Sequence, residues 1–541
     1  MRRLYTVIFL VVTLALFSQG AIFSDENYLH SEQEQLTFYP KADDNGWPMA
    51  GANPERTSWT PEEVRGDLSP AWYKIFEPYI LPRTQVIASG GLLYISTANG
   101  LYALDAETGS EKWVFPTELP LGNSPTVDNG VVYVGGYDHR LYALDALSGE
   151  SLWTFEAEGG FDTNPLVVGG MVFAGSRDGS FYAVDTQGPN TGKLAWKYPT
   201  GGQIHFSAAY KDGLVYFASD DSHAYALHAG SGVLVWKSEK LPGAGFRSWW
   251  PVIYEDYVIF AGSNNYRNGS AFGANALVNL DEEYVFPSRK KDPRGTLIGL
   301  LGQAAGNWVE GTVTIDTSKA NVTQNGSTKP VTQYFEDMPW RRTYFVLDRA
   351  TGKEYTSDFD KDGKPEYAPF LWFGTYTGNR YPPLVGNDGV LYQPNTYMSD
   401  PAIAGGQITG WMPGTPYISM ITSSWNAVDE PVAYSGGGNL IYWNRCCDRV
   451  GGSIDISVPY QPEKIQKDRV GSYFSYDLQE RLPGYNASYY TPNASFGGRT
   501  GVYGIHGDVN PPVPYAGKVY MIRSNALIAF GNTVENHKVL S

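Results

Sequence analysis

The sequence predicts an all-β protein, a β-propeller of four-stranded antiparallel blades whose last blade is closed by strands from both ends of the chain. Three observations predict this fold. The string LYALDAETGSEKWVF at 101–115 returns as LYALDALSGESLWTF at 141–155, and in looser form at 181–198 and 224–237. Its tryptophans, Trp113, Trp153, Trp196 and Trp236, are spaced by 40, 43 and 40 residues. Each copy also has an upstream half of short apolar runs, and such a period is typical of propeller blades.

Each repeat has the pattern of four strands joined by tight turns. The apolar runs are separated by turn-forming pairs such as Asn129-Gly130 and Asp212-Gly213, which are hairpin signals. One blade cannot bury both of its faces, so blades must stack around an axis. The tryptophan that ends each repeat has roughly 200 Å² of mostly apolar surface, which suits it to fill the space between neighbours. Blades one to four are expected from about residue 83 to residue 240.

The repeated string resembles the tryptophan-docking motif of the pyrroloquinoline quinone (PQQ) repeat family. The motif is Ala-x-Asp-x-x-x-Gly-x-x-x-Trp, found at Ala103, Asp105, Gly109 and Trp113, and again at Ala143, Asp145, Gly149 and Trp153. The resemblance implies the propeller fold. It does not select an activity, because the family contains eight-bladed quinoprotein alcohol dehydrogenases and also non-enzymatic propellers such as the B lipoprotein of the bacterial outer-membrane barrel-assembly machinery.

The chain that precedes the first blade is expected to close the ring. Residues 47–60, WPMAGANPERTSWT, resemble the short segment before the first blade of PQQ-repeat proteins. Residues 68–76, LSPAWYKIF, then have the pattern of an outermost strand without its three inner strands. We expect this strand, with Trp72, to complete the last blade beside a strand at 526–530, because closure removes exposed sheet edges. A single propeller domain is expected over residues 46–541.

The later blades are less regular than the first four. A fifth blade opens at 247–262, and its third strand is expected only at 343–347, so blade five carries a long insertion at about 264–341. Loops of that length are usually functional, disordered or small subdomains. Further blades are expected to start at Tyr381, Trp425 and Asn510. The prediction is eight blades, with seven as the alternative.

Composition and the N-terminus indicate an extracytoplasmic protein. The 541 residues carry a formal net charge of -16, which argues against a nucleic-acid partner because phosphate binding needs a basic face. Residues 1–20 have two arginines, a short apolar run and small residues, which predicts a signal peptide, with an uncleaved anchor as the alternative. Residues 21–45 are expected to be a flexible acidic segment. We therefore expect a secreted or periplasmic protein with no membrane span after cleavage.

One loop has the spacing of a calcium site. The string DFDKDGKPE places carboxylates and a backbone carbonyl at alternate positions around a tight turn, at Asp358, Asp360, Asp362, Lys364 (carbonyl) and Glu366. Calcium prefers six to eight oxygen ligands, which this spacing supplies in part. The loop resembles the calcium-binding hairpin of integrin-type propeller repeats more than an EF-hand, because Pro369 stands at position twelve. We expect a structural calcium ion, with an acidic solvated turn as the alternative.

The two cysteines, Cys446 and Cys447, are adjacent. In a secreted chain they can form a vicinal disulfide or remain free thiols. The PQQ dehydrogenases carry such a disulfide beside the quinone, and the resemblance raises that role. The pair here aligns with the turn between the third and fourth strands, at the other end of a blade, so the role is not carried over.

The ligand-binding end of the ring is predicted where the inner strands start and where the turns between second and third strands lie. The inner-strand starts contribute cations, amides and aromatics, namely Arg83, Asn123, Asn164, His205, Arg247, Trp249, Arg380, Trp425 and Asn510. This set could hold an anionic planar ligand such as PQQ. The alternative is that a propeller funnel is simply polar and wet.

The dehydrogenase interpretation lacks its expected residues. The resemblance implies a calcium ion over the quinone, held by a glutamate and an asparagine, with an aspartate as base, all from the turns between second and third strands. The first four of these turns contain no glutamate, and Asp138, Asp178 and Asp221 recur in them as turn formers. The sequence therefore favours a secreted binding or scaffold protein with a protein or small-molecule ligand at the funnel. The alternative is a PQQ-dependent dehydrogenase acting on an alcohol or sugar.

Overall fold

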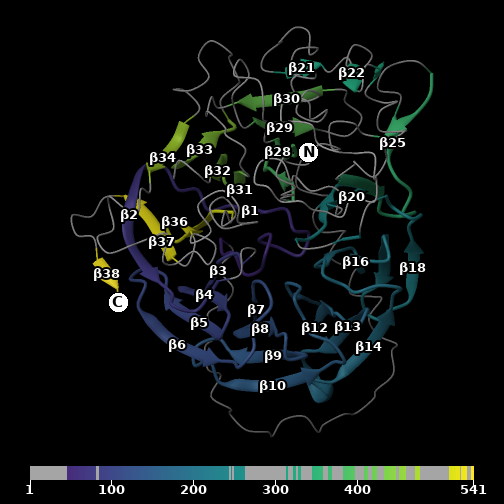
Figure 1. Ribbon diagram of the computed structural model, residues 1–541. Helices are drawn as coiled ribbons and strands as arrows, with labels where there is room; N and C mark the ends of the chain where they lie inside the picture. Colours follow the sequence, from purple (N-terminus) through teal and green to yellow (C-terminus); the bar gives the residue numbers. More distant parts are fainter. Residues whose placement is uncertain are drawn as a thin grey trace, which may run out of the picture. The chain divides into compact units, whose positions relative to one another are not determined.

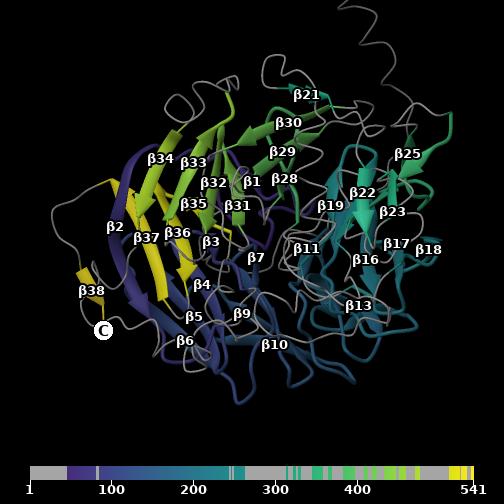
Figure 2. The same ribbon diagram turned by 45° about the horizontal axis from the view of Figure 1, so that its top comes forward.

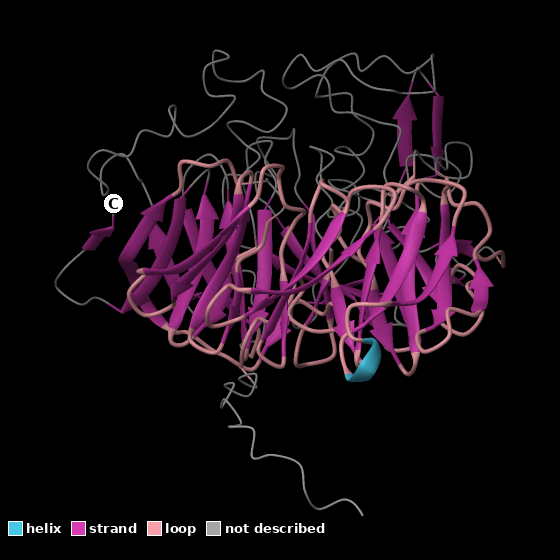
Figure 3. Ribbon diagram, turned by 90° about the horizontal axis from the view of Figure 1, so that it is seen from below, coloured by secondary structure: helices cyan, strands magenta, loops and turns pink. Residues whose placement is uncertain are grey.

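The chain divides into two compact units, Met1–Tyr39 and Pro40–Ser541, in a computed structural model. The structure describes residues 45–80, 84–242, 245–246, 249–261, 312–314, 321–324, 327–330, 344–357, 363–367, 382–395, 407–411, 417–422, 432–445, 450–457, 470–475, 511–523, 526–532 and 538–540. All elements below belong to the second unit. In these ranges no helix is long and apolar enough to cross a membrane. The one helix described is the 3-10 turn η1 (Gly188–Asn190), drawn in cyan in Figure 3.

Four consecutive antiparallel sheets reproduce the four repeats expected from the sequence (Figure 1). Their strands run in chain order from the axis outward. They are β3 (Ile87–Ser89), β4 (Leu92–Thr97), β5 (Gly100–Asp105) and β6 (Glu111–Pro116); β7 (Thr126–Asp128), β8 (Val131–Gly135), β9 (Arg140–Asp145) and β10 (Ser151–Glu156); β11 (Leu166–Val168), β12 (Met171–Gly175), β13 (Ser180–Asp185) and β14 (Leu194–Pro199); and β15 (Ala209–Lys211), β16 (Leu214–Ser219), β17 (His223–His228) and β18 (Leu234–Lys237).

The repeated alanine and tryptophan pair with each other in all four sheets. Ala103 lies opposite Trp113 across β5 and β6, and the same register recurs in the next three blades as Ala143↔Trp153, Ala183↔Trp196 and Ala226↔Trp236. A register shift follows beside each pair. A small residue opposite the indole leaves room for it to cover the sheet, which explains why the motif keeps alanine at this position.

The indole of each blade packs on the glycine of the next blade's third turn. A Cβ added at Gly149 would lie 2.5 Å from the Trp113 ring, and Gly192, Gly232 and Gly352 meet the following tryptophans at 3.1, 2.6 and 2.6 Å. Gly149 has a φ of +74°. The Trp113 indole N–H also donates to Ala146 O at 3.1 Å, in the same turn. The sequence motif thus encodes contacts between blades, as its family resemblance implies.

Blade five is assembled across the insertion. β19 (Val252–Tyr254) and β20 (Tyr257–Ala261) pair with β24 (Tyr344–Asp348), which confirms the third strand expected at 343–347. Two hairpins also belong to this part of the chain, β22 (Asn321–Gln324) with β23 (Ser327–Pro330), and β25 (Thr356–Ser357) with β26 (Glu366–Tyr367). A strand within the predicted insertion, β21 (Thr312–Thr314), pairs with the outer strand of the next sheet.

The remaining sheets complete the ring. One contains β27 (Leu384–Val385), β28 (Leu391–Asn395), β29 (Gln407–Trp411), β30 (Tyr417–Thr422) and β21. The other, of ten strands, contains β1 (Trp59–Thr60), β31 (Val432–Gly437), β32 (Leu440–Arg445), β33 (Val450–Asp455), β34 (Val470–Ser475), β2 (Gly66–Ile75), β35 (Val513–Tyr515), β36 (Lys518–Arg523), β37 (Ala526–Asn532) and β38 (Lys538–Leu540).

The predicted ring closure is confirmed. β2 pairs antiparallel with β37, with Trp72 opposite Ala529 and Ile75 opposite Ala526, so the N-terminal strand is the fourth strand of the last blade (Figure 2). β38 then adds in parallel to the outer edge of β2, which the sequence did not predict.

Separate sheets of three or more strands number seven in the described part of the chain, which is the alternative count. The prediction of eight counts the ten-stranded sheet twice. That sheet holds two four-stranded antiparallel units, β31–β34 and β35–β37 with β2, joined where β2 and β34 pair in parallel through Gly66↔Ser472 and Asp67↔Tyr473. The two counts therefore describe one arrangement, because two neighbouring blades share a hydrogen-bonded edge.

Residues 47–60, here called the axial segment, run along the innermost strands of successive blades. In chain order, the segment forms backbone hydrogen bonds to the first strands of blades one, two, four, five, six and seven. The pairs are Trp47 with Ala88, Pro48 O with Val127 N, Pro54 O with Tyr210 N, Glu55 O with Ile253 N, Thr57 O with Val385 N and Ser58 O with Gly436 N. β1, at its end, pairs in parallel with β31. The inner strands thus satisfy their axis-facing N–H groups with the protein's own chain.

Arg56 anchors the axial segment. Its side chain is fully buried, and burial lowers the pKa of its guanidinium to about 9. The guanidinium donates only to carbonyl oxygens, to Ala208 O through Nε at 2.9 Å, to Pro165 O through Nη2 at 3.2 Å and to Ala50 O through Nη1. One side chain therefore links the segment to blades three and four.

Candidate functional site

The funnel end of the ring is the end at which the inner strands begin. The structure describes four of the nine residues predicted there, Asn123, Asn164, His205 and Trp249. The other five lie outside the described residues, namely Arg83, Arg247, Arg380, Trp425 and Asn510. The prediction that the turns between second and third strands share this end holds for the described blades, because the pairs Asp162–Arg177 and His205–Asp220 join inner-strand starts to such turns.

Asn164 belongs to a belt of hydrogen bonds between blades. Gln85 N–H donates to Ser124 Oγ at 2.7 Å, and Ser124 N–H donates to Asn164 Oδ1 at 2.8 Å. Asn164 in turn donates to Ser207 Oγ from its backbone and from its side-chain amide, both at 2.9 Å. Asn164 is 2% exposed. Its amide therefore holds blades two, three and four together and is not offered to a ligand.

Trp249 also lies away from the funnel. It is buried in the core of blades four to six and packs edge-to-face against Trp250, with ring centroids 5.6 Å apart. Its φ of +71° is unusual for a large side chain. The sequence identified Trp249 as a ligand-facing aromatic, and the structure places it in the packing of the inner wall.

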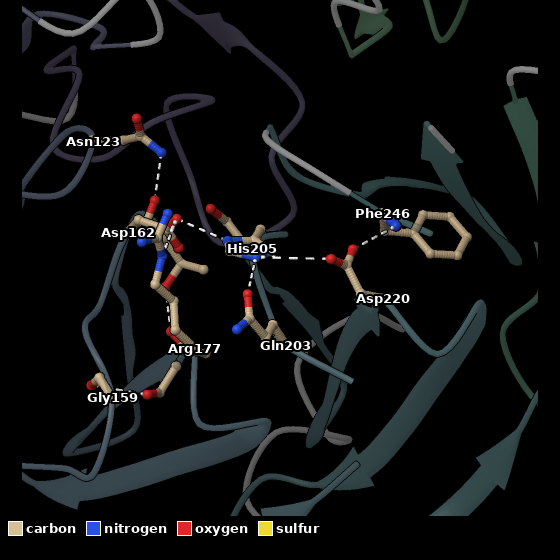
Figure 4. Close-up of polar contacts among 12 residues, drawn as sticks. Asn123, Gly159, Asp162, Arg177, Gln203, His205, Asp220 and Phe246 are labelled. Carbon is tan, nitrogen blue, oxygen red and sulfur yellow. Dashed lines mark hydrogen bonds and ion pairs between the residues drawn. The ribbon is translucent and has the colours of Figure 1, made fainter. Parts of the chain in front are cut away.

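His205 is the centre of a polar cluster at the funnel end, shown in Figure 4. Its Nδ1 lies 2.8 Å from Asp162 Oδ2 and its Nε2 lies 2.9 Å from Gln203 Oε1. A second carboxylate, that of Asp220, has Oδ2 3.7 Å from Nε2. Asn123 takes part through its side-chain amide, which donates to the backbone carbonyl of Asp162 at 2.5 Å. Two of the predicted residues, Asn123 and His205, thus converge on Asp162.

Arg177 completes this cluster from the turn between β12 and β13. Its Nε donates to Asp162 Oδ2 at 3.1 Å, and its guanidinium lies over the ring of Tyr137, 4.6 Å from the centroid. Arg177 and His205, the two neighbours that can carry a positive charge, therefore both bond to the same oxygen, Asp162 Oδ2. The other oxygen, Asp162 Oδ1, is buried and has no hydrogen-bond partner in the described part of the chain. A buried carboxylate oxygen without a donor is costly, so this atom favours a donor from outside the chain.

The recurring aspartates of the second turns are structural. Tyr182 Oη donates to Asp178 Oδ2 at 2.7 Å, and the same bond four residues apart joins Tyr142 to Asp138 and Tyr225 to Asp221. Burial and this hydrogen bond raise the pKa of Tyr182 to about 12. Burial raises the pKa of Asp221, but bonds from Tyr225, Gly201 N–H and His223 N–H outweigh it and lower that pKa overall. Their assignment as turn formers is confirmed.

Four members of the cluster escaped sequence reasoning, namely Asp162, Arg177, Gln203 and Asp220. Asp162 and Gln203 stand two and four residues before the belt residues Asn164 and Ser207, where the chain is irregular, so strand periodicity gives no orientation for them. Arg177 and Asp220 precede the turn-forming aspartate of their own turns by one residue. This shared position, one residue before the turn-forming aspartate, is the sequence signal that could have identified Arg177 and Asp220.

A groove of about 530 Å³ lies where the ring closes. It is lined by the end of β2 and the turn between β4 and β5, including Lys74, Glu77, Asn99 and Tyr102. Lys74 is held by Glu111 at 3.4 Å, and Phe76 packs edge-to-face on Tyr102. These contacts join the last blade to blade one, so closure of the ring explains the polar and aromatic residues that line the groove.

The predicted calcium loop is described only at its ends. Asp358, Asp360 and Asp362 lie outside the described residues, whereas Lys364 is exposed and Gly363 has a φ of +89°. Thr356 pairs with Tyr367 and Ser357 with Glu366, so the loop closes a hairpin. Among the described residues no group of three or more potential metal ligands occurs. Cys446 and Cys447 also lie outside the described residues, but in the sequence they separate β32 from β33, the second and third strands of their blade, so the predicted position between third and fourth strands is wrong.

Comparison with known proteins agrees with this architecture. Residues 97–189 and 159–277 match the family model described as outer membrane protein assembly factor BamB. The quinohemoprotein alcohol dehydrogenase of Comamonas testosteroni is similar in structure, with a TM-score of 0.52, 15% identity, and coverage of 92% of this chain and 82% of that one. Residues 97–277 thus carry PQQ-type repeats, and the chain has the β-propeller fold.

Two further solved structures resemble this propeller. Quinohemoprotein alcohol dehydrogenase ADHIIG of Pseudomonas putida HK5 has a TM-score of 0.51 at 14% identity, covering 92% of this chain and 82% of its own. BamB of Moraxella catarrhalis has a TM-score of 0.47 at 11% identity, covering 86% and 100%. A search of curated proteins gives no match. At these identities the solved structures show the fold alone.

The described part of the funnel end of this propeller does not fit PQQ. A quinone with three carboxylates needs cationic or amide donors, whereas the described cluster contains the carboxylates of Asp162 and Asp220, and its arginine, Arg177, and the Asn123 amide already bond to Asp162. The described second turns supply no glutamate, and their aspartates are bonded to tyrosines.

Proposed function

We propose that this propeller is an extracytoplasmic binding or scaffold protein that recognises a partner at the funnel end. The observation that carries the proposal is the Asp162–His205–Asp220 cluster with its unpartnered acceptor, Asp162 Oδ1. Such a site complements a hydrogen-bond donor or a basic side chain of a partner, and repels an anionic cofactor. The matched family is described as an outer-membrane assembly factor, which supports a scaffold role and an extracytoplasmic location.

The axial segment supports the same proposal. It is bonded to the axis-facing edges of the inner strands of six blades, so the protein's own chain lines the axis at these strands. A wall held by hydrogen bonds in this way suits capture of a projecting group from a partner. The predicted structural calcium ion at the 358–366 loop belongs to the proposal as a stabiliser of the blade-five hairpin.

Site-specific cross-linking tests the proposed partner site. A photo-reactive residue at Gln203, which is exposed at the funnel, should give a discrete cross-linked product in an envelope extract, and Asp162→Asn with Asp220→Asn should abolish it. The same residue placed at Ser110, in the turn at the opposite end of blade one, is the control and should give no such product. A product unaffected by the two asparagine substitutions would contradict the proposal.

The dehydrogenase alternative is tested on the same purified protein. PQQ and calcium are added, and quinone absorbance and dye reduction are followed with a panel of alcohols and sugars. The proposal expects no saturable quinone binding and no turnover. Saturable binding with turnover would establish the dehydrogenase instead.

A further inference from the structure

The large exposed apolar side chains of the described residues gather on one side of the ring. Seven such side chains are 38% to 58% exposed. Six of them belong to the outer strands of blades two to four or to the turns that lead into these strands. They are Leu147, Leu152, Leu194, Val233, Leu234 and Val235, and the seventh is Leu119. Figure 1 shows the strands concerned, β10, β14 and β18, along the outer rim of neighbouring blades.

Blade four has the longest exposed run. Val233, Leu234 and Val235 are 58%, 40% and 38% exposed and are consecutive in the sequence. Packing between blades does not require them, because Trp236 alone docks on Gly352 of the next blade and is buried. A run of three exposed apolar residues is unfavourable in water unless it has a function.

The repeat itself shows that the residue before the docking tryptophan can be charged. The residue before the docking tryptophan is Val235 in blade four and Leu152 in blade two, but Lys112 in blade one. Lys112 is exposed and pairs with Asp105 at 3.0 Å. Lysine on an outer strand is a common protection against edge-to-edge association, and blade four lacks it at this position.

The backbone edge of β18 carries no other strand in the described part of the chain. There β18 is hydrogen-bonded on one side only, to β17, and stands at the end of its sheet. The chain shows elsewhere what such an edge accepts, because β38 adds in parallel to the outer edge of β2 through Trp72↔Lys538 and Lys74↔Leu540. An outer edge of this propeller thus accommodates an added extended strand.

The charges beside the apolar run are positive on both neighbouring outer strands. Lys197 follows Trp196 on β14, and Lys237 follows Trp236 on β18, so the two lysines occupy the same register position. Both are exposed, and Lys237 Nζ also lies 3.6 Å from Asp221 Oδ2. The chain as a whole carries a net charge of -16, which makes this local positive character distinctive. Its complement is a segment that combines apolar and acidic side chains.

We propose that the open edge of β18, with the apolar residues 233–235, binds an extended acidic and apolar segment of a partner protein by β-strand addition. Main-chain hydrogen bonds to β18 would supply affinity, and the apolar run with Lys237 would select the segment. This surface is separate from the funnel cluster and does not depend on it.

A blocked peptide that alternates valine and glutamate is the probe, titrated against the full-length protein by fluorescence anisotropy. Val235→Ser removes the exposed apolar side chain without adding charge, so it should fold, and it should weaken binding by at least about tenfold through lost apolar burial. Lys112→Val is the matched control on blade one and should leave the affinity unchanged. The same peptide with alternate backbone nitrogens methylated should fail to bind, because it keeps its side chains but cannot pair with an edge.

Hydrogen exchange locates the contact. The proposal expects slower amide exchange in residues 233–238 when the peptide is bound, and no change in the funnel residues 203–205. Equal binding by Val235→Ser, binding of the methylated peptide, or protection elsewhere would overturn the proposal. Concentration-dependent dimerisation that protects 233–238 without peptide would also overturn it, since the occupant would then be a second copy of the chain.

Discussion

At the scale of the residue, the contact between Gly149 and Trp113 explains why the motif keeps glycine four residues before the next tryptophan. Gly149→Ala puts a methyl group 2.5 Å from the indole at a φ of +74°. We expect a loss of about 2 to 4 kcal/mol in unfolding free energy, because overpacking adds to the backbone strain. Chemical denaturation measures this loss.

Gly213→Ala is the matched control for that substitution. Gly213 has a similar φ of +82°, but an added Cβ meets nothing within 4 Å. The control should therefore lose only about 1 kcal/mol, the cost of the left-handed backbone. Equal losses in the two variants would show that indole docking does not limit this position.

Residue roles at the funnel end were the least predictable part of the sequence. Asn123, Asn164 and His205 all precede inner strands, yet they stand at different heights, so Asn164 joins the buried belt while His205 reaches Asp162. The chain before an inner strand has no regular period, and side-chain orientation there is set by contacts with neighbouring blades. Trp249 was placed at the funnel for the same reason and lies in the core.

At the scale of the element, the axial segment depends on Arg56. Replacing Arg56 with methionine keeps the volume but leaves the carbonyls of Ala50, Ala208 and Pro165 buried without this donor. We expect a loss of about 3 kcal/mol or more in unfolding free energy, since each unsatisfied buried acceptor is costly. Lys211→Met is the control, because Lys211 makes a partly exposed ion pair with Glu55 at 3.0 Å and should cost about 1 kcal/mol or less.

The blade-five hairpin gives a second prediction at this scale. If the 358–366 loop binds calcium, the ion raises the melting temperature of the wild-type protein, and Asp360→Ala removes that increase while leaving the melting temperature in chelator unchanged. Differential scanning calorimetry with calcium and with chelator measures both. Asp256→Ala, at an exposed turn of the same blade, should respond to calcium as the wild type does. Equal melting of Asp360→Ala and wild type under both conditions would remove the calcium site.

At the scale of the whole molecule, the sequence predicted the ring and its closure but not its axis. Repeated strings fix the first four blades, and the isolated strand around Trp72 correctly indicates closure beside β37. The axial segment has no periodicity, and its contacts are backbone bonds to residues spread from Ala88 to Gly436, which leave no pattern in the sequence. The shared edge between β34 and β2 is likewise invisible to repeat counting.

Acid stability is a property of the whole ring, because turns in several blades carry carboxylates of lowered pKa. Burial raises the pKa of Asp105, Asp221 and Asp455, but the hydrogen bonds and lysine or arginine partners of each outweigh burial and lower it. Near pH 4 the folded protein therefore binds fewer protons than the unfolded chain, so its stability is full above that pH and is lost as the pH falls through the lowered values.

Melting temperatures between pH 7 and pH 2.5 should show this decline. Asp221→Asn should lower stability at pH 7 and flatten the decline, whereas Asp67→Asn, at an exposed position, should leave the curve unchanged. A stability that rises on acidification would mean that desolvation of these carboxylates outweighs their partners.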